Sequence, residues 1–393
     1  MTYKILWLSD TALSPTGYSN VTKHVLNGLT ARSWNCTNIG HNYLNRPLSP
    51  PIRILGSSET INFKCLPGDM QAAHAQNLIE PYINQFKPDL FVILLDTFMC
   101  YPWLLNKNIS CKSVFYFPTD GDPFPIGCDA ILRKVTKPIA MSKFGRDQVF
   151  KDHGILADYI PHGVDSNKFI PYTPEMKMAA RLKWNLPPDA FIMGNNFRNQ
   201  GRKLGDRLLH TFARFVRKNP KSLLFLNCDP KDVAAHFDMQ SLARRLNIQG
   251  NIRYTDMGWM TGLPEESIID FYNMLDVKVD LTSGEGFGIT TIESMSCQTP
   301  VVMTNYTTTK EIVMDHDAGI GVPMDNIVTG SWNVDRGFVS IDKAVEALQY
   351  LKDNPCEGKR MGVNGRKAVL EEYDYETKVL PMFDKKFREL IEK

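Results

Sequence analysis

The 393-residue sequence has few of the features that would tie a protein to membranes, nucleic acids or an oxidising compartment. Lysine and arginine barely outnumber aspartate and glutamate (45 against 43), so no strong field towards nucleic acid is expected. No stretch approaches the roughly eighteen consecutive apolar residues of a bilayer-spanning helix. The eight cysteines form no Cys-x-x-Cys pair, which favours reduced thiols in the core.

The start of the chain and its length set further expectations. The apolar part of Met1–Asp10 is too short for a signal peptide and is typical of a first strand, which predicts a cytoplasmic protein. A chain of 393 residues can form two or three domains with large cores. Apolar runs that alternate with helical patterns predict an α/β protein with parallel sheets. Residues 42–70, rich in Pro, Ser and Asn, are expected to be irregular.

The clearest local pattern runs from Asp276 to Met303. Apolar and charged residues alternate up to Leu281, as in a strand, and small residues from Ser283 to Gly288 predict a tight loop. Apolar residues at helical spacing then predict a helix over 289–297. Pro300 ends this helix, and Val301 begins a further strand.

A glycine-rich loop before a helix predicts a phosphate or diphosphate site, because the first helical amides and the helix dipole favour an anion. Glycine also lets the anion approach the backbone closely. Glu285 and Glu293 lie in the same stretch (293 − 285 = 8). Carboxylates suit the vicinal hydroxyls of a ribose or hexose, so the two features together indicate a sugar nucleotide. The alternative is a glycine-rich turn with two solvated acids.

The motif around these glutamates resembles the donor site of retaining GT-B glycosyltransferases, the large family with a two-glutamate signature (glycosyl transferases group 1). The resemblance rests on Glu-Gly-Phe-Gly at 285–288, Glu293, and Cys-x-Thr-Pro-Val-Val at 297–302. Ile-Pro-His-Gly-Val-Asp at 160–165 is similar to the family's Ile-Pro-Asn-Gly-Val-Asp, and we expect His162 to be a core or turn residue. Gln298 stands where the family usually has glycine. The resemblance covers nearly the whole chain, strongly from about residue 139 onward.

This resemblance implies a fold and a division into domains. In the GT-B fold, two Rossmann-like domains face each other across a cleft. The N-terminal acceptor domain would comprise residues 1–170, with a C-terminal helix at 375–393 crossing back onto it. The nucleotide-sugar donor domain would comprise residues 171–374.

The resemblance also implies roles for donor-domain residues. Glu293 would hold the ribose hydroxyls and Glu285 hydroxyls of the transferred sugar. Arg198 and Lys203, five positions apart, would neutralise the leaving diphosphate, with Arg202 as a possible substitute. Backbone groups near Gly258 would meet the base. The expected donor-binding residues are Gly17, Arg198, Lys203, Gly258, Glu285, Gly286, Phe287, Gly288, Ile289, Thr290, Thr291 and Glu293.

On the acceptor side, the loop at 14–18 is similar to the family loop between donor phosphate and acceptor, which would place Thr16 and Tyr18 near the acceptor. Many members carry a histidine where this chain has Thr119 and Asp120, so these two are candidates for the polar group facing the reaction, with Asp120 as a catalytic candidate. Aromatic residues between Phe98 and Phe124 would contact the acceptor where they are not part of the core.

No metal and no cofactor are expected. Asp120-Gly121-Asp122 resembles the Asp-x-Asp metal motif of the other major transferase fold. The GT-B resemblance argues against this role, because enzymes of that fold bind diphosphate with helix dipoles and cations.

The predicted function is transfer of a sugar from a UDP- or GDP-sugar to an acceptor hydroxyl, with retention of the anomeric configuration. A saccharide or glycoconjugate is the first choice of acceptor, and a nucleic-acid base is the second. The sequence is also compatible with a GT-B epimerase or phosphorylase, and with a catalytically silent subunit that binds a nucleotide sugar. The oligomeric state is left open.

Overall fold

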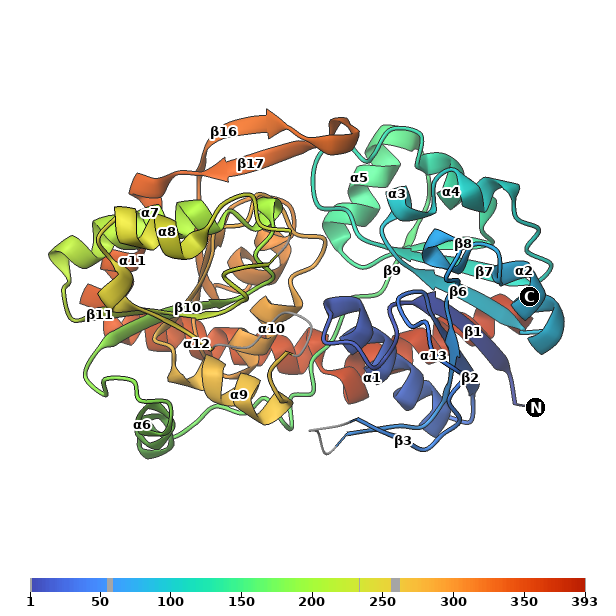
Figure 1. The fold of residues 1–393 in the computed structure, drawn as a ribbon, viewed down its shortest axis with the longest axis horizontal. Coiled ribbons are helices and arrows are strands. Elements are labelled where there is room, and N and C mark those ends of the chain that lie inside the picture. Colours follow the sequence, from blue (N-terminus) through green and yellow to red (C-terminus); the bar gives the residue numbers. More distant parts are fainter. Residues whose placement is uncertain (1, 55–58, 233, 256–261, 393) are drawn as a thin grey trace. The chain divides into compact units, whose positions relative to one another are not determined.

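The structure, a computed structural model, describes residues 2–54, 59–232, 234–255 and 262–392 (Figure 1). Its contacts divide the chain into two compact units. Unit 1 comprises Met1–Gly163, Ser331–Val334 and Tyr375–Lys393, and unit 2 comprises Val164–Gly330 and Asp335–Asp374. The first boundary lies seven residues before the expected one (170 − 163 = 7), and the C-terminal segment is grouped with unit 1.

Unit 1 is built on a seven-stranded parallel sheet with the order β5-β2-β1-β6-β7-β8-β9. The strands β1, β6 and β7 are buried along almost their whole length, as in parallel sheets covered on both faces. A separate antiparallel pair is formed by β3 and β4. The strands are β1 (Lys4–Ser9), β2 (Asn35–Gly40), β3 (Ile52–Arg53), β4 (Thr60–Ile61), β5 (Lys64–Pro67), β6 (Leu90–Leu94), β7 (Lys112–Phe117), β8 (Lys137–Ala140) and β9 (Asp158–Tyr159).

The expectation that residues 42–70 are irregular is wrong for the short pair of β3 and β4 and for β5. This strand pairs in parallel with β2 at the edge of the sheet, and its Cys65 and Leu66 side chains are buried. Neither β2 nor β5 has a long apolar run, and β2 reads Asn-Cys-Thr-Asn-Ile-Gly. Their strand conformation depends on pairing and burial in the folded chain, which local propensity does not predict.

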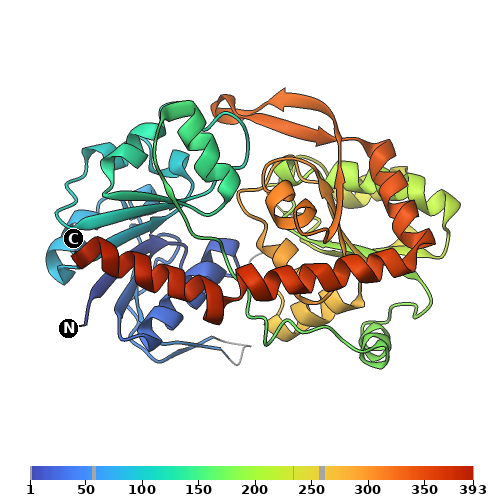
Figure 2. The same ribbon diagram turned by 180° about the vertical axis from the view of Figure 1, so that it is seen from behind.

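The helices of unit 1 flank this sheet, and the last one comes from the C-terminal end of the chain. Figure 2 shows this C-terminal helix in red along the sheet of unit 1. Its Phe383 packs against Trp7 of β1 and Tyr116 of β7, with ring centroids 6.3 and 5.3 Å apart. This packing explains why residues 375–393 belong to unit 1. The helices are α1 (Gly17–Ala31), α2 (Ile79–Phe86), α3 (Thr97–Cys100), α4 (Asp129–Lys134), α5 (Lys143–His153) and α13 (Leu380–Glu392).

Unit 2 is built on a six-stranded parallel sheet with the order β12-β11-β10-β13-β14-β15. A β-hairpin of β16 and β17, which the sequence did not predict, follows it. The strands are β10 (Phe191–Asn196), β11 (Ser222–Asn227), β12 (Ile252–Tyr254), β13 (Val277–Asp280), β14 (Val301–Thr304), β15 (Gly319–Val322), β16 (Met324–Thr329) and β17 (Asp335–Val339).

The helices of unit 2 cover both faces of its sheet, with α7 and α8 on one face and α9 on the other (Figure 1). The predicted strand, loop, helix and strand from Asp276 to Met303 are confirmed as β13, α10 and β14, with end points within two residues. The helices are α6 (Pro174–Lys183), α7 (Gly205–Lys218), α8 (Met239–Arg245), α9 (Glu265–Met274), α10 (Ile289–Ser296), α11 (Ile341–Asp353) and α12 (Pro355–Ala368).

In the described part of the chain, no helix combines the length and the apolar character needed to cross a bilayer. All eight cysteines are free thiols. Six of them are buried, as expected for core residues, while Cys111 is partly buried and Cys356 is exposed.

The helix α12 packs closely against the end of α10 at Gly362. A Cβ atom built on Gly362 would lie 2.0 Å from the carbonyl oxygen of Gln298, which is a backbone atom and cannot swing away. Gln298 itself has a φ of 59°, the left-handed conformation for which glycine is favoured. Gln298, which stands where the family motif usually has glycine, thus adopts a backbone conformation that glycine takes without strain.

We expect Gly362→Ala to lower the free energy of unfolding by about 1–3 kcal/mol, because the added methyl group forces α12 away from the backbone beside it. Gly358 in the same helix is the matched control, since its nearest neighbours would be 3.8 Å from a Cβ atom. Gly358→Ala should be neutral or stabilising by about 0.5–1 kcal/mol. Urea unfolding of both variants measures the difference, and equal stabilities would contradict the packing argument.

His162 is a buried residue of unit 1, in agreement with the core or turn position expected for it. The Tyr116 hydroxyl donates to the carbonyl oxygen of Ile160 (2.9 Å) and lies 2.8 Å from Nδ1 of His162. The phenol has a single proton, and it lies in the hydrogen bond to the Ile160 carbonyl oxygen. His162 therefore donates its Nδ1–H to the phenol oxygen. Burial lowers the pKa of His162 to about 3.

Unit 1 should therefore lose stability as the pH falls. In the unfolded chain His162 takes up a proton below its ordinary pKa of about 6.5, whereas the folded protein resists protonation down to about 3. Between these values the unfolded state binds more protons, so acid favours unfolding. We expect the urea midpoint to fall between pH 7 and pH 5, and to fall less in His162→Asn. The same pH dependence in both proteins would assign the effect to other groups.

Candidate functional site

The glycine-rich loop between β13 and α10 is held by hydrogen bonds from both sides. Ser283 donates its amide to the carbonyl oxygen of Arg202 (2.9 Å), and the Glu285 amide donates to Oγ1 of Thr307 (3.0 Å). Gly288 has a φ of 108° and stands directly before the first residue of α10, a conformation that strains any residue with a Cβ atom. The predicted tight loop is therefore a fixed structure with a required glycine.

The beginning of α10 offers backbone amides to a ligand. The first amides of any α-helix lack an acceptor within the helix, and they carry the positive end of its dipole. These are the amides near Gly288, Ile289 and Thr290, and their expected role in binding a diphosphate stays a prediction. The Thr291 amide already donates to the Gly288 carbonyl oxygen (2.9 Å), and Phe287 is buried against Tyr373, so only the backbone of Phe287 can serve a ligand.

Glu285 lies beside this helix start in contact with two cations. The ammonium of Lys203 bonds to its Oε1 atom, and Nη1 of Arg202 donates to the same atom at 3.1 Å. The carboxylate side chain is 8% exposed. A short 3-10 turn over Gly201–Lys203 brings both cations to the loop. The structure thus places Glu285, Lys203 and Arg202 together.

Arg198 lies differently from the expected pair with Lys203. Its guanidinium donates to both carboxylate oxygens of Asp232, at 2.8 and 3.3 Å. Within unit 2, Arg202 rather than Arg198 shares Glu285 with Lys203. The expected roles of Arg198 and Lys203 at a diphosphate stay predictions.

A buried ion pair that the sequence reasoning missed lies beneath the loop. Lys278 and Asp280 of β13 are both fully buried, with Nζ and Oδ2 2.9 Å apart. The Lys278 ammonium also donates to Oγ1 of Thr291 (3.2 Å) in α10. Burial alone would raise the pKa of Asp280, but the Lys278 and Lys203 cations outweigh it and hold the pKa below its ordinary value. The Lys-x-Asp pattern in the strand was the sequence feature from which this ion pair could have been predicted.

Glu293 is buried, so the alternative of a solvated acid is wrong for this residue. It belongs to a hydrogen-bonded network across the carboxyl ends of β10, β11 and β12. The Tyr272 hydroxyl donates to Glu293 Oε2 (2.6 Å) and accepts from Asn196 (3.0 Å). Asn227 donates to Asn196 (2.9 Å) and accepts from the Thr255 hydroxyl (2.7 Å). Burial of Tyr272, followed by the charge of Glu293, raises the phenol pKa.

Gly258, the residue expected near the base, lies outside the described residues. Thr255, a member of the network of Glu293, is the last described residue before this segment. Sequence reasoning did not find Tyr272, Asn196 or Asn227, because each is an isolated polar residue without a motif.

Thr16 and Tyr18, two of the residues expected on the acceptor side, lie at the beginning of α1. Thr16 caps this helix by accepting from the Ser19 amide (3.1 Å), its hydroxyl donates to Asp10, and Gly17 is the first helical residue. The Tyr18 hydroxyl donates to Asp96 (3.1 Å). Burial of this phenol, followed by the charges of Asp96, Asp120 and Asp10, raises its pKa. Asp120 is thus electrostatically linked to Tyr18.

Thr119 is buried, and its hydroxyl oxygen has no hydrogen-bond partner among the described residues. Most of the aromatic side chains expected to divide between core and acceptor site are part of the core. Phe98, in contrast, is 40% exposed. The fully buried ones are Phe115, Tyr116, Phe117 and Phe124.

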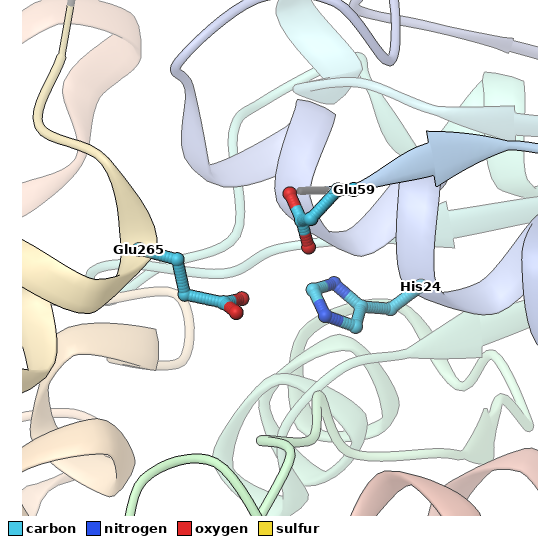
Figure 3. Close-up of side chains that lie close together, drawn as sticks. All are labelled: His24, Glu59 and Glu265. Carbon is cyan, nitrogen blue, oxygen red and sulfur yellow. The ribbon is translucent and has the colours of Figure 1, made fainter. Parts of the chain in front are cut away.

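The described residues of neither unit, taken alone, contain three clustered metal ligands. Figure 3 draws His24 and Glu59, which belong to unit 1, together with Glu265, which belongs to unit 2. Unit 1 therefore supplies only two of these three possible ligands. Nδ1 of His24 bonds to the Asn20 carbonyl oxygen (2.9 Å). Asp122 of the Asp-x-Asp sequence accepts from Gln148 (2.8 Å) and Lys151 (3.0 Å).

Comparison with known proteins connects this geometry to a family. Residues 177–368 match the family model described as glycosyl transferases group 1. The chain is 27% identical over 210 residues to a D-inositol 3-phosphate glycosyltransferase of Streptomyces bingchenggensis, covering 51% of this chain and 45% of that protein. It is 26% identical over 228 residues to a GDP-mannose-dependent monoacylated alpha-(1-6)-phosphatidylinositol monomannoside mannosyltransferase of Corynebacterium glutamicum, covering 56% and 53%. The chain spans about half the length of the curated relatives it matches.

A sucrose-phosphate synthase structure from Thermosynechococcus elongatus is similar over 99% of both chains, with a TM-score of 0.78 and 17% sequence identity. At that identity the likeness shows the fold alone, which is the predicted GT-B glycosyltransferase fold. The family match covers the segment that carries Glu285, Glu293 and the cations beside them. Residues 177–368, just under half of the chain, are thus similar to the glycosyl transferases of group 1.

Proposed function

We propose that the protein transfers a sugar from a nucleotide diphosphate sugar to a hydroxyl group of a saccharide or glycoconjugate, with retention of the anomeric configuration. The observation that carries this proposal is the meeting of Glu285, Lys203 and Arg202 at the glycine-rich loop before α10. A helix start with two adjacent cations favours a diphosphate, and the carboxylate among them suits sugar hydroxyls.

The diphosphate is the leaving group, and negative charge grows on it as the bond to the sugar breaks. Amides near Gly288, Ile289 and Thr290 would stabilise this charge together with Lys203 and Arg202. Lys203 bonds to Glu285, and this contact holds its ammonium group at the loop. Arg198 is the further cation that the family motif assigns to this role.

The nucleotide sugar also carries hydroxyl groups that need partners. Glu293 would accept from the ribose hydroxyls, and Tyr272 supports this by donating to Oε2 and so fixing the direction of the carboxylate. Glu285 would accept from hydroxyls of the transferred sugar. Two carboxylates on different parts of one ligand would hold it at both ends.

The proposed reaction needs no nucleophile from the protein. The acceptor oxygen bonds to the anomeric carbon on the face from which the diphosphate departs, and the acceptor proton passes to the departing phosphate oxygen. Retention follows because the entering and leaving oxygens share one face. On the acceptor side, Thr16, Gly17, Tyr18, Thr119 and Asp120 are the residues proposed to position the hydroxyl.

The names of the relatives support a sugar nucleotide as donor and a saccharide-type acceptor. One relative is named as GDP-mannose-dependent, and another as acting on D-inositol 3-phosphate. For this chain, a UDP- or GDP-sugar is proposed without a choice between the two bases.

Glu293→Gln should weaken nucleotide-sugar binding while leaving a side chain of the same shape that still accepts from Tyr272. Loss of the charge-assisted contact to the ribose should raise Kd about tenfold to a hundredfold, or about 1.5–3 kcal/mol. Calorimetry with UDP-glucose and GDP-mannose measures this, using whichever binds the unaltered protein.

The matched control is Glu266→Gln, the same chemical change at an exposed position of α9, the helix that carries Tyr272. Its donor affinity should equal that of the unaltered protein. Unchanged affinity in Glu293→Gln, at an unchanged unfolding temperature, would remove Glu293 from the donor site.

Sugar transfer should proceed without a divalent metal, because the cations and the start of α10 supply the positive charge. Activity after treatment with EDTA should therefore remain close to that of the untreated protein. The measurement is sugar transfer from the bound donor to a panel of saccharides. Complete loss that Mn²⁺ or Mg²⁺ restores would contradict the proposal and bring Asp120 and Asp122 back as metal ligands.

A further inference from the structure

A pocket of about 330 Å³ lies in unit 1, next to the carboxyl ends of β1 and β2. Nothing in the family motif or the comparisons assigns it a role. The segment 69–74 forms one wall, and His41, the residue after β2, forms part of another. Its described lining residues are His41, Leu44, Asp69, Met70, Gln71, Ala72, Ala73 and His74.

Two imidazoles dominate the polar lining of this pocket. The rings of His41 and His74 lie with centroids 5.1 Å apart and planes inclined by 58°. Nε2 of His41 is 2.8 Å from Oδ1 of Asp10, and both side chains are only 14% exposed. The carboxylate favours the tautomer with the proton on Nε2, because only that form donates to Asp10. Nδ1 of His41 is then left for a hydrogen bond with a ligand.

His74 is held in the pocket wall by an unusual backbone. His74 and Ala75 both have a φ of 56°, although neither is glycine, and this conformation costs free energy at each position. Ala75 is fully buried in the core of unit 1, which fixes the turn. Nδ1 of His74 is buried and has no hydrogen-bond partner among the described residues. A buried polar atom without a partner favours any ligand that can bond to it.

The charges around the pocket select the kind of ligand. Burial, followed by the neighbouring His41, lowers the pKa of His74, so this imidazole is neutral at physiological pH. Asp69 lies in the same wall, and Asp10 lies behind His41. No lysine or arginine is among the described lining residues. Two carboxylates and a neutral imidazole disfavour a phosphate or another anion.

A hydroxyl group fits this surface better, because it can donate to one imidazole nitrogen and accept from another group. The Gln71 amide and the Asp69 carboxylate add further partners for hydroxyls. Leu44 and Met70, which are 54% and 80% exposed, lie at the rim and could cover an apolar ring face. We propose that this pocket binds an uncharged polyhydroxyl ring, a saccharide or polyol, as a subsite for the acceptor.

The assignment of the bound ring as the acceptor rests on the proposed function. Binding of a neutral ring in the pocket does not depend on it. The experiment is saturation-transfer NMR on the full chain with methyl α-glucopyranoside, methyl α-mannopyranoside and myo-inositol as probes. Glucose 6-phosphate and inositol 1-phosphate are the charged counterparts. UDP and GDP, added to the same samples, report on nucleotide binding separately.

We expect the unaltered protein to bind at least one neutral probe, and His74→Gly to bind it about tenfold more weakly, as for the loss of one hydrogen bond. Glycine adopts the positive φ of this position without strain, so the turn should persist. The exposed Gln71→Ala is a second lining variant with little risk to folding, and it should also weaken binding. Gln76→Ala, just outside the pocket, is the matched control and should change nothing.

Three results would overturn the inference: binding of none of the neutral probes, unchanged binding in both lining variants, or preference for the phosphorylated probes. Each is distinguishable from failure of the proposed function. A protein that binds the neutral probe but neither nucleotide would keep the pocket and remove the donor site. A protein that binds a nucleotide but no neutral probe would do the reverse.

Discussion

The ion pair between Lys278 and Asp280 is the interaction on which the candidate donor site depends. Two charges removed from water are costly unless each finds close partners. Lys278 has Asp280 and the Thr291 hydroxyl, and Asp280 is further stabilised by the nearby Lys203 cation. Lys203 in turn bonds to Glu285 in the loop. Alternating charges thus run from the centre of the sheet to the glycine-rich loop, and each one fixes the position of the next.

The polar network of Glu293 also fixes side chains at the candidate donor site, by hydrogen bonds from uncharged groups. Tyr272 of α9, with Asn196, Asn227 and Thr255, connects Glu293 of α10 to the ends of three neighbouring strands. In such a chain each group orients its neighbour, so the carboxylate direction is set by the sheet instead of by the ligand. A site whose polar groups are fixed in advance loses little free energy on reorganisation when charge develops.

The sequence predicted those parts of the structure that local chemistry determines. Gly288 and Pro300 mark the loop and the helix end, and the elements from β13 to β14 were placed within two residues. The edge strand β5 was missed, because its conformation depends on a partner that lies far away in sequence. Burial of Lys278 and Asp280 was missed for a related reason. Alternating apolar and charged residues are typical of a half-exposed strand, and only the folded chain shows that both faces are covered.

The spacing of cations likewise could not show which of them reaches Glu285. Three cations lie between residues 198 and 203, and the turn over Gly201–Lys203 directs Arg202 and Lys203 to the loop while Arg198 reaches Asp232. Leu204, in the left-handed conformation with a φ of 48°, then connects this turn to α7. A motif gives residue types and distances along the chain, but the direction of each side chain comes from such local turns.

The two units differ in the electrostatic character of their candidate sites. In unit 2 the polar groups are ionised and paired, with Lys203 and Arg202 beside a carboxylate. In unit 1 the pocket of His41 and His74 is lined by the Asp69 carboxylate and by no lysine or arginine among its described residues, and burial lowers the pKa of His74. A nucleotide diphosphate brings negative charge that needs compensation, whereas an acceptor hydroxyl brings none. The difference between the sites therefore matches the difference in charge between the two substrates of the proposed reaction.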